Sequence, residues 1–191
     1  MAQTRTKLLV EDYPLTTAGV VLRPVSIGDL KLYRDLVTRA SGFFDAFEGG
    51  FPSDESLRDT FTELPPGCSP EDKNSIGVFD VRSGSGSGST LVGFADIVAG
   101  YPDSDSWYIG LLLLAEDVRG RGLGSAVISA LESLLVARGA RDLYLAVYDA
   151  NIPGRAFWQA LGFVPVKHAP EHRNAVGELL PTTRLRKSLV V

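Results

Sequence analysis

Three glycines at alternate positions, Gly120, Gly122 and Gly124, form the part of this sequence best suited to chemistry. They follow an apolar run and precede a long amphipathic stretch, which places them in a turn between a strand and a helix. Glycines let a ligand approach the backbone closely, and the first amides of a helix attract anions because they lack partners within the helix. Arg119 and Arg121 add positive charge beside the turn. The pattern predicts a turn that binds a phosphate group.

The elements on both sides of this turn are predicted from their periodicity. Residues 107–114 are apolar on both faces, which is typical of a buried central strand. After the turn, apolar residues recur at helical spacing on one face, namely Leu123, Ala126, Val127, Ala130, Leu131, Leu134 and Leu135. Gly139 is placed to stop this helix. Alternation over residues 143–148 predicts a further strand.

Two motifs resemble the GNAT superfamily of acyl-CoA N-acyltransferases. Arg119–Gly124 is similar to the family's Arg/Gln-x-x-Gly-x-Gly/Ala signature, and Asn151–Phe163 is similar to its Asn-x-x-Ala-x-x-x-Tyr-x-x-x-Gly-Phe region. Val20–Leu30 resembles the first strand and helix start of many members. The resemblance implies an α/β (α+β) fold with a mixed, mostly antiparallel central sheet of about seven strands flanked by helices. We expect a single acyltransferase domain over residues 19–191, preceded by a tail or added edge strand over residues 1–18.

The resemblance also implies that acetyl-CoA is the acyl donor. In this family the pyrophosphate rests on the amides of the glycine-rich turn, and the pantetheine arm lies between splayed central strands, where a backbone amide can hydrogen-bond the thioester carbonyl. The residues implied for coenzyme binding are Leu112, Leu113, Leu114, Val118, Arg119, Gly120, Arg121, Gly122, Leu123, Gly124, Ser125, Asn151, Phe157 and Trp158. A backbone amide already oriented to hydrogen-bond the thioester carbonyl lowers the activation barrier by roughly 3 kcal/mol.

The sequence departs from the family pattern at two catalytic positions. Trp158 stands where many members place a tyrosine that protonates the leaving thiolate, and an indole N–H does not act as an acid near neutral pH. Tyr108 stands where some relatives carry a glutamate base. The candidates for acid and base are therefore Tyr108, Tyr148 and Asp96, although a packing role for each stays open.

The segment between the first two expected helices is the candidate for acceptor recognition, because in this fold it overhangs the acceptor end of the cleft. It carries aromatic and acidic residues, of which Phe43, Phe44, Asp45, Phe47 and Glu48 are the candidate acceptor contacts. Rings and carboxylates together suit a cationic amine with an apolar portion. The alternative is that the rings anchor this loop to the core.

Composition excludes several classes of partner. The chain has 191 residues, 45% of them apolar, and a formal net charge of −4, which argues against nucleic acid and anionic membranes. The single cysteine, Cys68, suits a reducing cytoplasm. We expect no metal site, because Pro170 opposes a helix that would align His168 with His172.

The remaining elements are predicted with simple signals. The first helix is expected from about Leu30 to Ser41–Gly42, and a second from Ser53, a good N-cap, to Leu64. Strands over residues 75–82 and 90–98 are expected to form a hairpin joined by a flexible Gly/Ser connector at 83–89. A short helix over residues 153–161 and strands near 163–167 and 183–189 complete the chain.

The remaining alternatives concern the ligand, the activity and the oligomeric state. A dinucleotide-binding turn is disfavoured, because Gly124 is one place early for that fingerprint and Asp142 begins its strand instead of ending it. The expected activity is direct transfer of an acetyl group to a primary amine of a small molecule or peptide. A coenzyme-binding regulatory module, another acyl-CoA donor and a homodimer stay open.

Overall fold

A computed structural model describes residues 8, 12–81, 90–168, 172–174 and 176–189, and the connector expected at 83–89 lies outside them. The strands are β1 Leu15–Thr17, β2 Val20–Pro24, β3 Lys73–Asp80, β4 Thr90–Ala99, β5 Ser106–Leu114, β6 Asp142–Tyr148, β7 Val164–His168, β8 His172–Arg173, β9 Leu179–Leu180 and β10 Thr182–Ser188. The α-helices are α1 Leu30–Thr38, α2 Ser41–Phe47, α3 Asp54–Asp59, α4 Leu123–Ala137 and α5 Ile152–Ala160. Short 3-10 turns are η2 Ile27–Asp29, η3 Pro70–Asp72 and η4 Glu116–Val118.

The described strands form one large sheet and one small hairpin. The large sheet has eight strands in the order β1-β2-β3-β4-β5-β6-β10-β7, and β8 pairs with β9 separately. Every neighbouring pair in the large sheet is antiparallel except β5 and β6, which run parallel. The expected mixed, mostly antiparallel sheet is confirmed, with eight strands where about seven were expected; β1, in the segment expected as a tail or an added edge strand, pairs at the edge beside β2.

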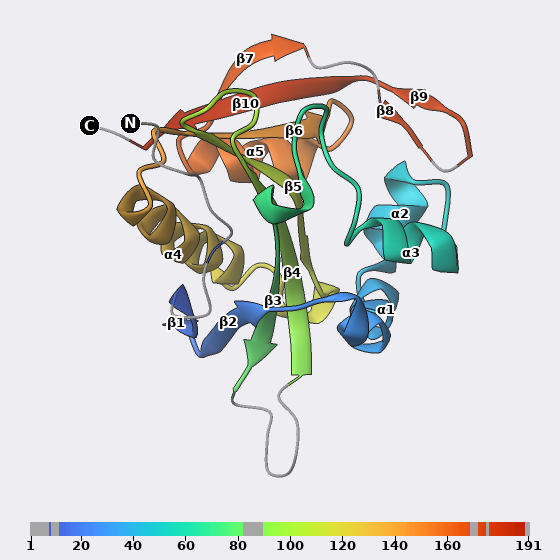
Figure 1. Cartoon of the computed structure of the whole chain (residues 1–191). Helices are drawn as coiled ribbons and strands as arrows, with labels where there is room; N and C mark the ends of the chain where they lie inside the picture. The colour runs from blue at the N-terminus through green and yellow to red at the C-terminus, as the bar shows by residue number, and fades with distance from the viewer. Residues whose placement is uncertain (1–7, 9–11, 82–89, 169–171, 175, 190–191) are drawn as a thin grey trace.

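Helices cover both faces of this sheet (Figure 1). On one face α1, α2 and α3 pack over β3, β4 and the end of β5, around the buried rings of Tyr33, Phe44 and Phe94. On the other face α4 and α5 pack against the second core, which contains Leu131 and Trp158. Neighbouring residues of β4 enter different cores, since Phe94 joins the first and Ala95 the second. The side-chain alternation of the strands therefore divides the interior into two cores.

The helix after the glycine-rich turn matches its prediction closely. It begins at Leu123 and ends at Ala137, and Gly139 follows in the left-handed conformation with φ of 83°. Its buried side includes Val127, Leu131 and Leu135. No helix in the described part of the chain is long and apolar enough to cross a bilayer.

Two predicted boundaries near the N-terminal half are wrong. The first helix ends at Thr38, and the segment expected as a loop instead forms α2. The second helix has its cap at Ser53 as predicted but ends at Asp59. The chain then tightens into a 3-10 turn, because the amide of Phe61 donates to the carbonyl of Arg58, three residues earlier, at 3.0 Å. An α-helix would instead bond to the carbonyl four residues earlier.

Candidate active site

The parallel strands β5 and β6 separate in the middle of the sheet. Their pairing ends at Ile109 and Leu145, although β5 continues to Leu114 and β6 to Tyr148. Within the described residues no ladder joins the two strands beyond that pair. Backbone groups of the second half of β5 that face β6 are therefore left without a strand partner, which a bound extended chain can exploit.

A β-bulge marks the point where this separation begins. On β4, Asp96 pairs with Leu111 while Ile97 pairs with Ile109, so Gly110 is an extra residue on β5. The bulge shifts the alternation by one place. Ile109 belongs to the core under α4, whereas Leu111 packs against the core under α1 to α3.

The glycine-rich turn follows β5 directly and has the geometry of an anion site. Gly120 and Gly122 have φ of 73° and 76°, and a Cβ added to either would meet no atom within 4 Å. These two positions therefore require glycine because of backbone conformation, and they face open space. Gly122 is the N-cap of α4 and no side chain caps the helix there. The first amides of α4 are consequently available to a ligand.

Contacts with the neighbouring strand and helix fix the position of the turn. The Arg119 guanidinium donates through Nε to the carbonyl of Leu114 at 2.9 Å, which ties the turn to the end of β5. A Cβ added to Gly124 would lie 3.1 Å from the Phe157 ring and 3.4 Å from Leu114. Gly124 thus allows α4, α5 and β5 to meet closely, and the structure brings these predicted coenzyme contacts together.

The other residues implied for coenzyme binding are distributed along the same turn and helix. Leu112 and Leu114 lie on β5 and are half-buried against the core under α4. The remaining ones are placed as follows: Val118 ends η4, Arg121 is exposed in the turn, Leu123 and Ser125 lie in the first turn of α4, and Leu113 is buried under α1 to α3.

Asn151 and Trp158 have structural contacts of their own. Asn151 is the N-cap of α5, and its Oδ1 accepts a hydrogen bond from the amide of Gly154 at 2.9 Å. The Trp158 side chain is buried between two rings, with centroid distances of 4.8 Å to Phe157 and 5.2 Å to Phe163. These contacts give both residues a role in the fold.

The helix α2 places some of the acceptor candidates in the core and others next to β6. Phe44 is buried in the core under α1 to α3, and Asp45 is exposed. Phe43 and Phe47 are half-buried, and both rings approach Tyr148. The structure therefore brings two of the predicted aromatic contacts to one predicted catalytic residue, whereas Phe44 packs into the core.

Tyr148, at the end of β6, is held by α2. Its ring stacks on Phe47 with centroids 5.2 Å apart, and its hydroxyl donates to Oε1 of Glu48 at 2.5 Å. Burial, reinforced by the hydrogen bond to Glu48, raises the pKa of Tyr148 above its ordinary value. The phenol is therefore neutral at physiological pH, and a neutral phenol is a poor base.

Tyr108 lies on β5, just before the bulge, beside another tyrosine and an arginine. Its ring meets Tyr101 edge to face at 5.2 Å, and Arg184 donates to the Tyr101 hydroxyl at 3.2 Å. Burial raises the pKa of Tyr108, although the Arg184 charge opposes the rise. Tyr108 is also neutral at physiological pH.

Asp96, the third catalytic candidate, is a buried carboxylate on β4. Lys73 of β3 donates to its Oδ2 at 2.8 Å, and the two side chains are only 6% and 10% exposed. Burial raises the pKa of Asp96, and the charge of Lys73 opposes that rise. Asp96 Oδ1 has no hydrogen-bond partner among the described residues.

Sequence reasoning missed the residues that join η4, just before the turn, to the end of α1 and the start of α2. Arg39 donates to both carboxylate oxygens of Asp117, at 2.8 Å and 2.9 Å, and to the carbonyl of Leu91 at 3.1 Å. Glu116 accepts from the amide of Gly42 at 2.9 Å, near the start of α2. The partners are far apart in the sequence, so local patterns carry no signal for them.

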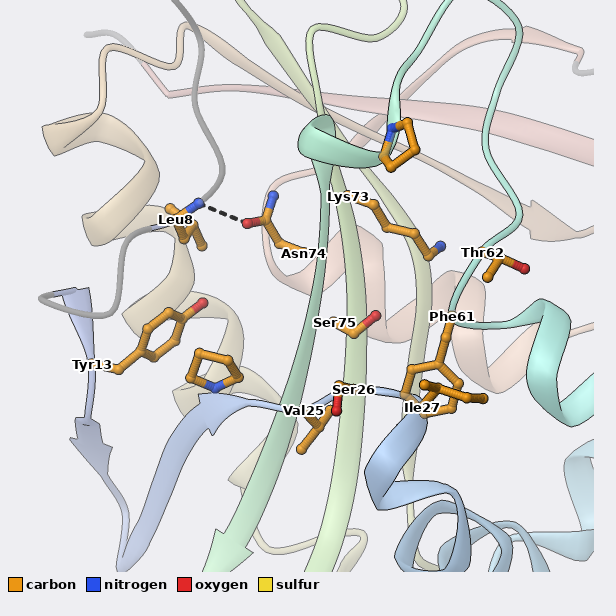
Figure 2. Close-up of a pocket in the computed structure, with 12 residues that line it drawn as sticks. Leu8, Tyr13, Val25, Ser26, Ile27, Phe61, Thr62, Lys73, Asn74 and Ser75 are labelled. Carbon is orange, nitrogen blue, oxygen red and sulfur yellow. Dashed lines mark hydrogen bonds between the residues drawn. The ribbon is translucent and has the colours of Figure 1, made fainter.

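A pocket of about 290 Å³ lies at the start of β3, where β2 no longer pairs with that strand (Figure 2). It is bounded by Leu8, Tyr13 and Asn74 on one side and by Phe61 and Thr62 on the other. None of the residues predicted for the site lines it. Within the described residues, no group of His, Cys, Asp and Glu side chains is arranged to hold a metal ion.

The chain is similar to several acetyltransferases of known structure. An acetyltransferase from Thermus thermophilus is 26% identical with a TM-score of 0.67, over 92% of this chain and 98% of that one. Spermidine N-acetyltransferase from Vibrio cholerae, in complex with CoA and spermine, is 17% identical with a TM-score of 0.67, over 90% and 96%. The ribosomal-protein-S18-alanine N-acetyltransferase from Escherichia coli is 16% identical with a TM-score of 0.64, over 90% and 95%. No curated protein matches the chain.

A sequence profile described as the Acetyltransferase (GNAT) family matches residues 44–163, which is more than half of the chain. The matched segment runs from α2 to the residue before β7 and includes the separated strands and the glycine-rich turn. The fold, the turn and the profile agree, and the chain belongs to the GNAT family of acetyltransferases.

Proposed function

We propose that the protein transfers the acetyl group of acetyl-CoA to a primary amine by direct attack in a ternary complex. The observation that carries this proposal is the opening between β5 and β6, which leads straight into a turn whose helix amides have no cap. An extended thiol arm suits the opening, and a pyrophosphate suits the turn. Residues 19–191 would act as one domain.

In this proposal the backbone of the turn and of β5 does most of the work on the donor. The amides from Gly122 to Ser125 would hold the pyrophosphate, with Arg121 adding positive charge. Leu112–Leu114 would hold the pantetheine arm, and one of their amides would stabilise the negative charge that develops on the thioester oxygen. Such an amide lowers the activation barrier by roughly 3 kcal/mol, because it is already oriented before the reaction.

The acceptor would lie where α2 meets the end of β6. Phe43 and Phe47 offer ring faces there, and Glu48 offers a carboxylate. Because the chain is acidic overall, with a formal net charge of −4, its field favours a cationic acceptor. A protonated primary amine with an apolar portion fits these groups.

The test is acceptor-dependent release of free thiol. Purified protein is incubated with acetyl-CoA and a panel of small amines, peptides and protein N-termini, and coenzyme A is measured with a thiol reagent. We expect thiol release with at least one amine and not in its absence. Coenzyme binding without amine-dependent thiol release across the panel would instead favour a coenzyme-binding regulatory module. Competition between acyl-CoA donors of different chain length identifies the acyl group that is transferred.

A further inference from the structure

Gly110 and Asp96 meet at the point where β5 leaves β6. The bulge makes Gly110 the extra residue of β5, and Gly110 is exposed. A Cβ added to Gly110 would lie 2.8 Å from Asp96 Oδ2 and 3.7 Å from Cγ. The carboxylate therefore lies directly against the bare backbone at the inner end of the opening. Any side chain at this position would intrude on it.

The environment of Asp96 is unusual for a residue with a purely structural role. Oδ2 accepts from Lys73, whose ammonium also donates to the carbonyl of Glu63 at 2.9 Å. Oδ1 is fully buried and has no hydrogen-bond partner among the described residues. A buried acceptor without a partner is destabilising, and in native proteins it calls for an explanation such as a catalytic role.

Groups from the surrounding elements define the charge that Asp96 experiences. Lys73 comes from β3, Glu63 from the segment after α3, and Tyr33 from α1. Figure 2 shows the Lys73 ammonium directed away from Leu8 and Asn74, toward the side of β3 where Phe61 and Thr62 lie. One cation thus faces Asp96 at hydrogen-bond distance, and it favours the ionised carboxylate.

The other two catalytic candidates are less suited to accept a proton. Tyr108 and Tyr148 are neutral phenols held in ring contacts. Tyr148 already donates its hydroxyl proton to Glu48. Of the three, only Asp96 is a carboxylate, and its Oδ2, which accepts from Lys73, lies against Gly110 where β5 leaves β6.

We propose that Asp96 is the general base of the acetyl transfer, reached across Gly110, and that Lys73 is a positioning residue that keeps its carboxylate ionised and oriented. This proposal rests on the proposed function. The acceptor ammonium gives one proton to Asp96, and the resulting neutral amine forms the C–N bond at the thioester carbonyl. The C–S bond then breaks, the sulfur takes the electron pair, and the second nitrogen proton passes to the thiolate. Asp96 afterwards releases its proton to solvent.

The experiment compares Asp96→Asn and Lys73→Met with the unmodified protein, using an amine found in the acceptor panel. For Asp96→Asn we expect kcat to fall at least about 100-fold with an unchanged Kd for coenzyme A, since general bases contribute roughly 100-fold or more. The acidic limb of the kcat/KM profile should also disappear. For Lys73→Met we expect that limb to move to higher pH while the plateau is largely kept, because loss of the cation raises the pKa of Asp96. A merely structural role would not move the limb.

Gly110→Ala supplies a second test if Asp96→Asn fails to fold. Gly110 does not have a positive φ, so alanine is compatible with the backbone, but its methyl group must displace the carboxylate. We expect kcat to fall at least about 10-fold with unchanged coenzyme affinity. If the folded Asp96→Asn protein keeps the wild-type kcat or an unshifted acidic limb, the role of Asp96 is overturned while the proposed function stands. Absence of amine-dependent turnover in the unmodified protein, with coenzyme A bound, would overturn the proposed function and this inference together.

Discussion

Replacement of Gly122 by aspartate tests the coenzyme site most directly. Gly122 is exposed and lies in the left-handed region with φ of 76°, and a Cβ there would meet no protein atom within 4 Å. Any other residue therefore adds backbone strain of about 1 kcal/mol without a steric clash in the free protein. A loss of coenzyme affinity larger than this strain must therefore come from the contact between the new side chain and the bound coenzyme.

The matched variant Gly122→Asn isolates the charge. Asparagine has nearly the shape of aspartate, tolerates the left-handed conformation and is neutral. Two like charges about 5 Å apart repel by about 3 kcal/mol at an effective dielectric constant of about 20, and solvent and salt reduce this at an exposed turn. We expect Gly122→Asp to bind coenzyme A about 10- to 100-fold more weakly than Gly122→Asn.

Isothermal titration with coenzyme A measures this difference, and thermal unfolding of the free proteins measures the strain. Gly139→Asp is the matched control, because Gly139 has φ of 83°, also faces open space, and lies at the other end of α4. It should lose at least as much stability, because a negative charge is unfavourable at the C-terminal end of a helix, and it should keep its coenzyme affinity. Equal affinities for the Asp and Asn variants of Gly122, with both proteins folded, would refute the placement of the pyrophosphate at this turn.

Three further predictions concern the fold around the site. Trp158→Tyr places a hydroxyl in the apolar contact with Phe163, so the free energy of unfolding should fall by about 1 to 3 kcal/mol in chemical denaturation, without a faster turnover. A faster enzyme would contradict this assignment of Trp158 to the core. Arg39→Met removes the hydrogen bonds to Asp117 and should lower the unfolding free energy by about 1 kcal/mol, whereas an unchanged melting temperature would mean that the link between the end of α1 and η4 adds no stability. Burial raises the pKa of Tyr33 from 10.0 to about 12, so the stability that the neutral Tyr33 phenol contributes is complete below pH 10 and is lost as the pH rises toward 12. Tyr33→Phe should therefore flatten the loss of stability at alkaline pH, followed by circular dichroism. An identical slope in the two proteins would refute this.

Local patterns were sufficient for the elements around the turn. The spacing of Leu131 and Leu135 and the stop at Gly139 defined α4, and the glycines indicated the turn before it, where Gly120 and Gly122 are left-handed in the structure. Each of these features depends on residues that are close together in the chain. Helix periodicity and the freedom of glycine are properties of short segments, which is why they can be inferred from sequence.

Features that depend on distant partners were not predictable. The helix α2 contains Gly42, a poor helix former, and its start is supported by Glu116, 74 positions away. The ion pair joins Lys73, the first residue of β3, to Asp96, the one charged residue of an otherwise mostly apolar β4. No short-range pattern indicates that these charges will be buried against one another.

The bulge at Gly110 was hidden for a different reason. The four residues that follow it, Leu111 to Leu114, are all leucine, so the shift from one face to the other changes no residue type. Ordinary alternation would have revealed the shift if polar and apolar residues had been mixed there. The prediction of a strand apolar on both faces was compatible with either register.

The same run of identical side chains has a consequence for how this protein can vary. A deletion at Gly110 would exchange the leucines that face the two cores while leaving composition and core volume almost unchanged, so the sheet itself would offer little resistance to it. What resists the slip is the attachment of the residues that follow the strand to other elements, because the amides of Ala115 and Glu116 donate to the carbonyls of Val92 and Arg39, each at 2.9 Å. We therefore expect natural and engineered variants to accept exchanges among apolar residues at Leu111 to Leu114 and very few changes in the length of this strand.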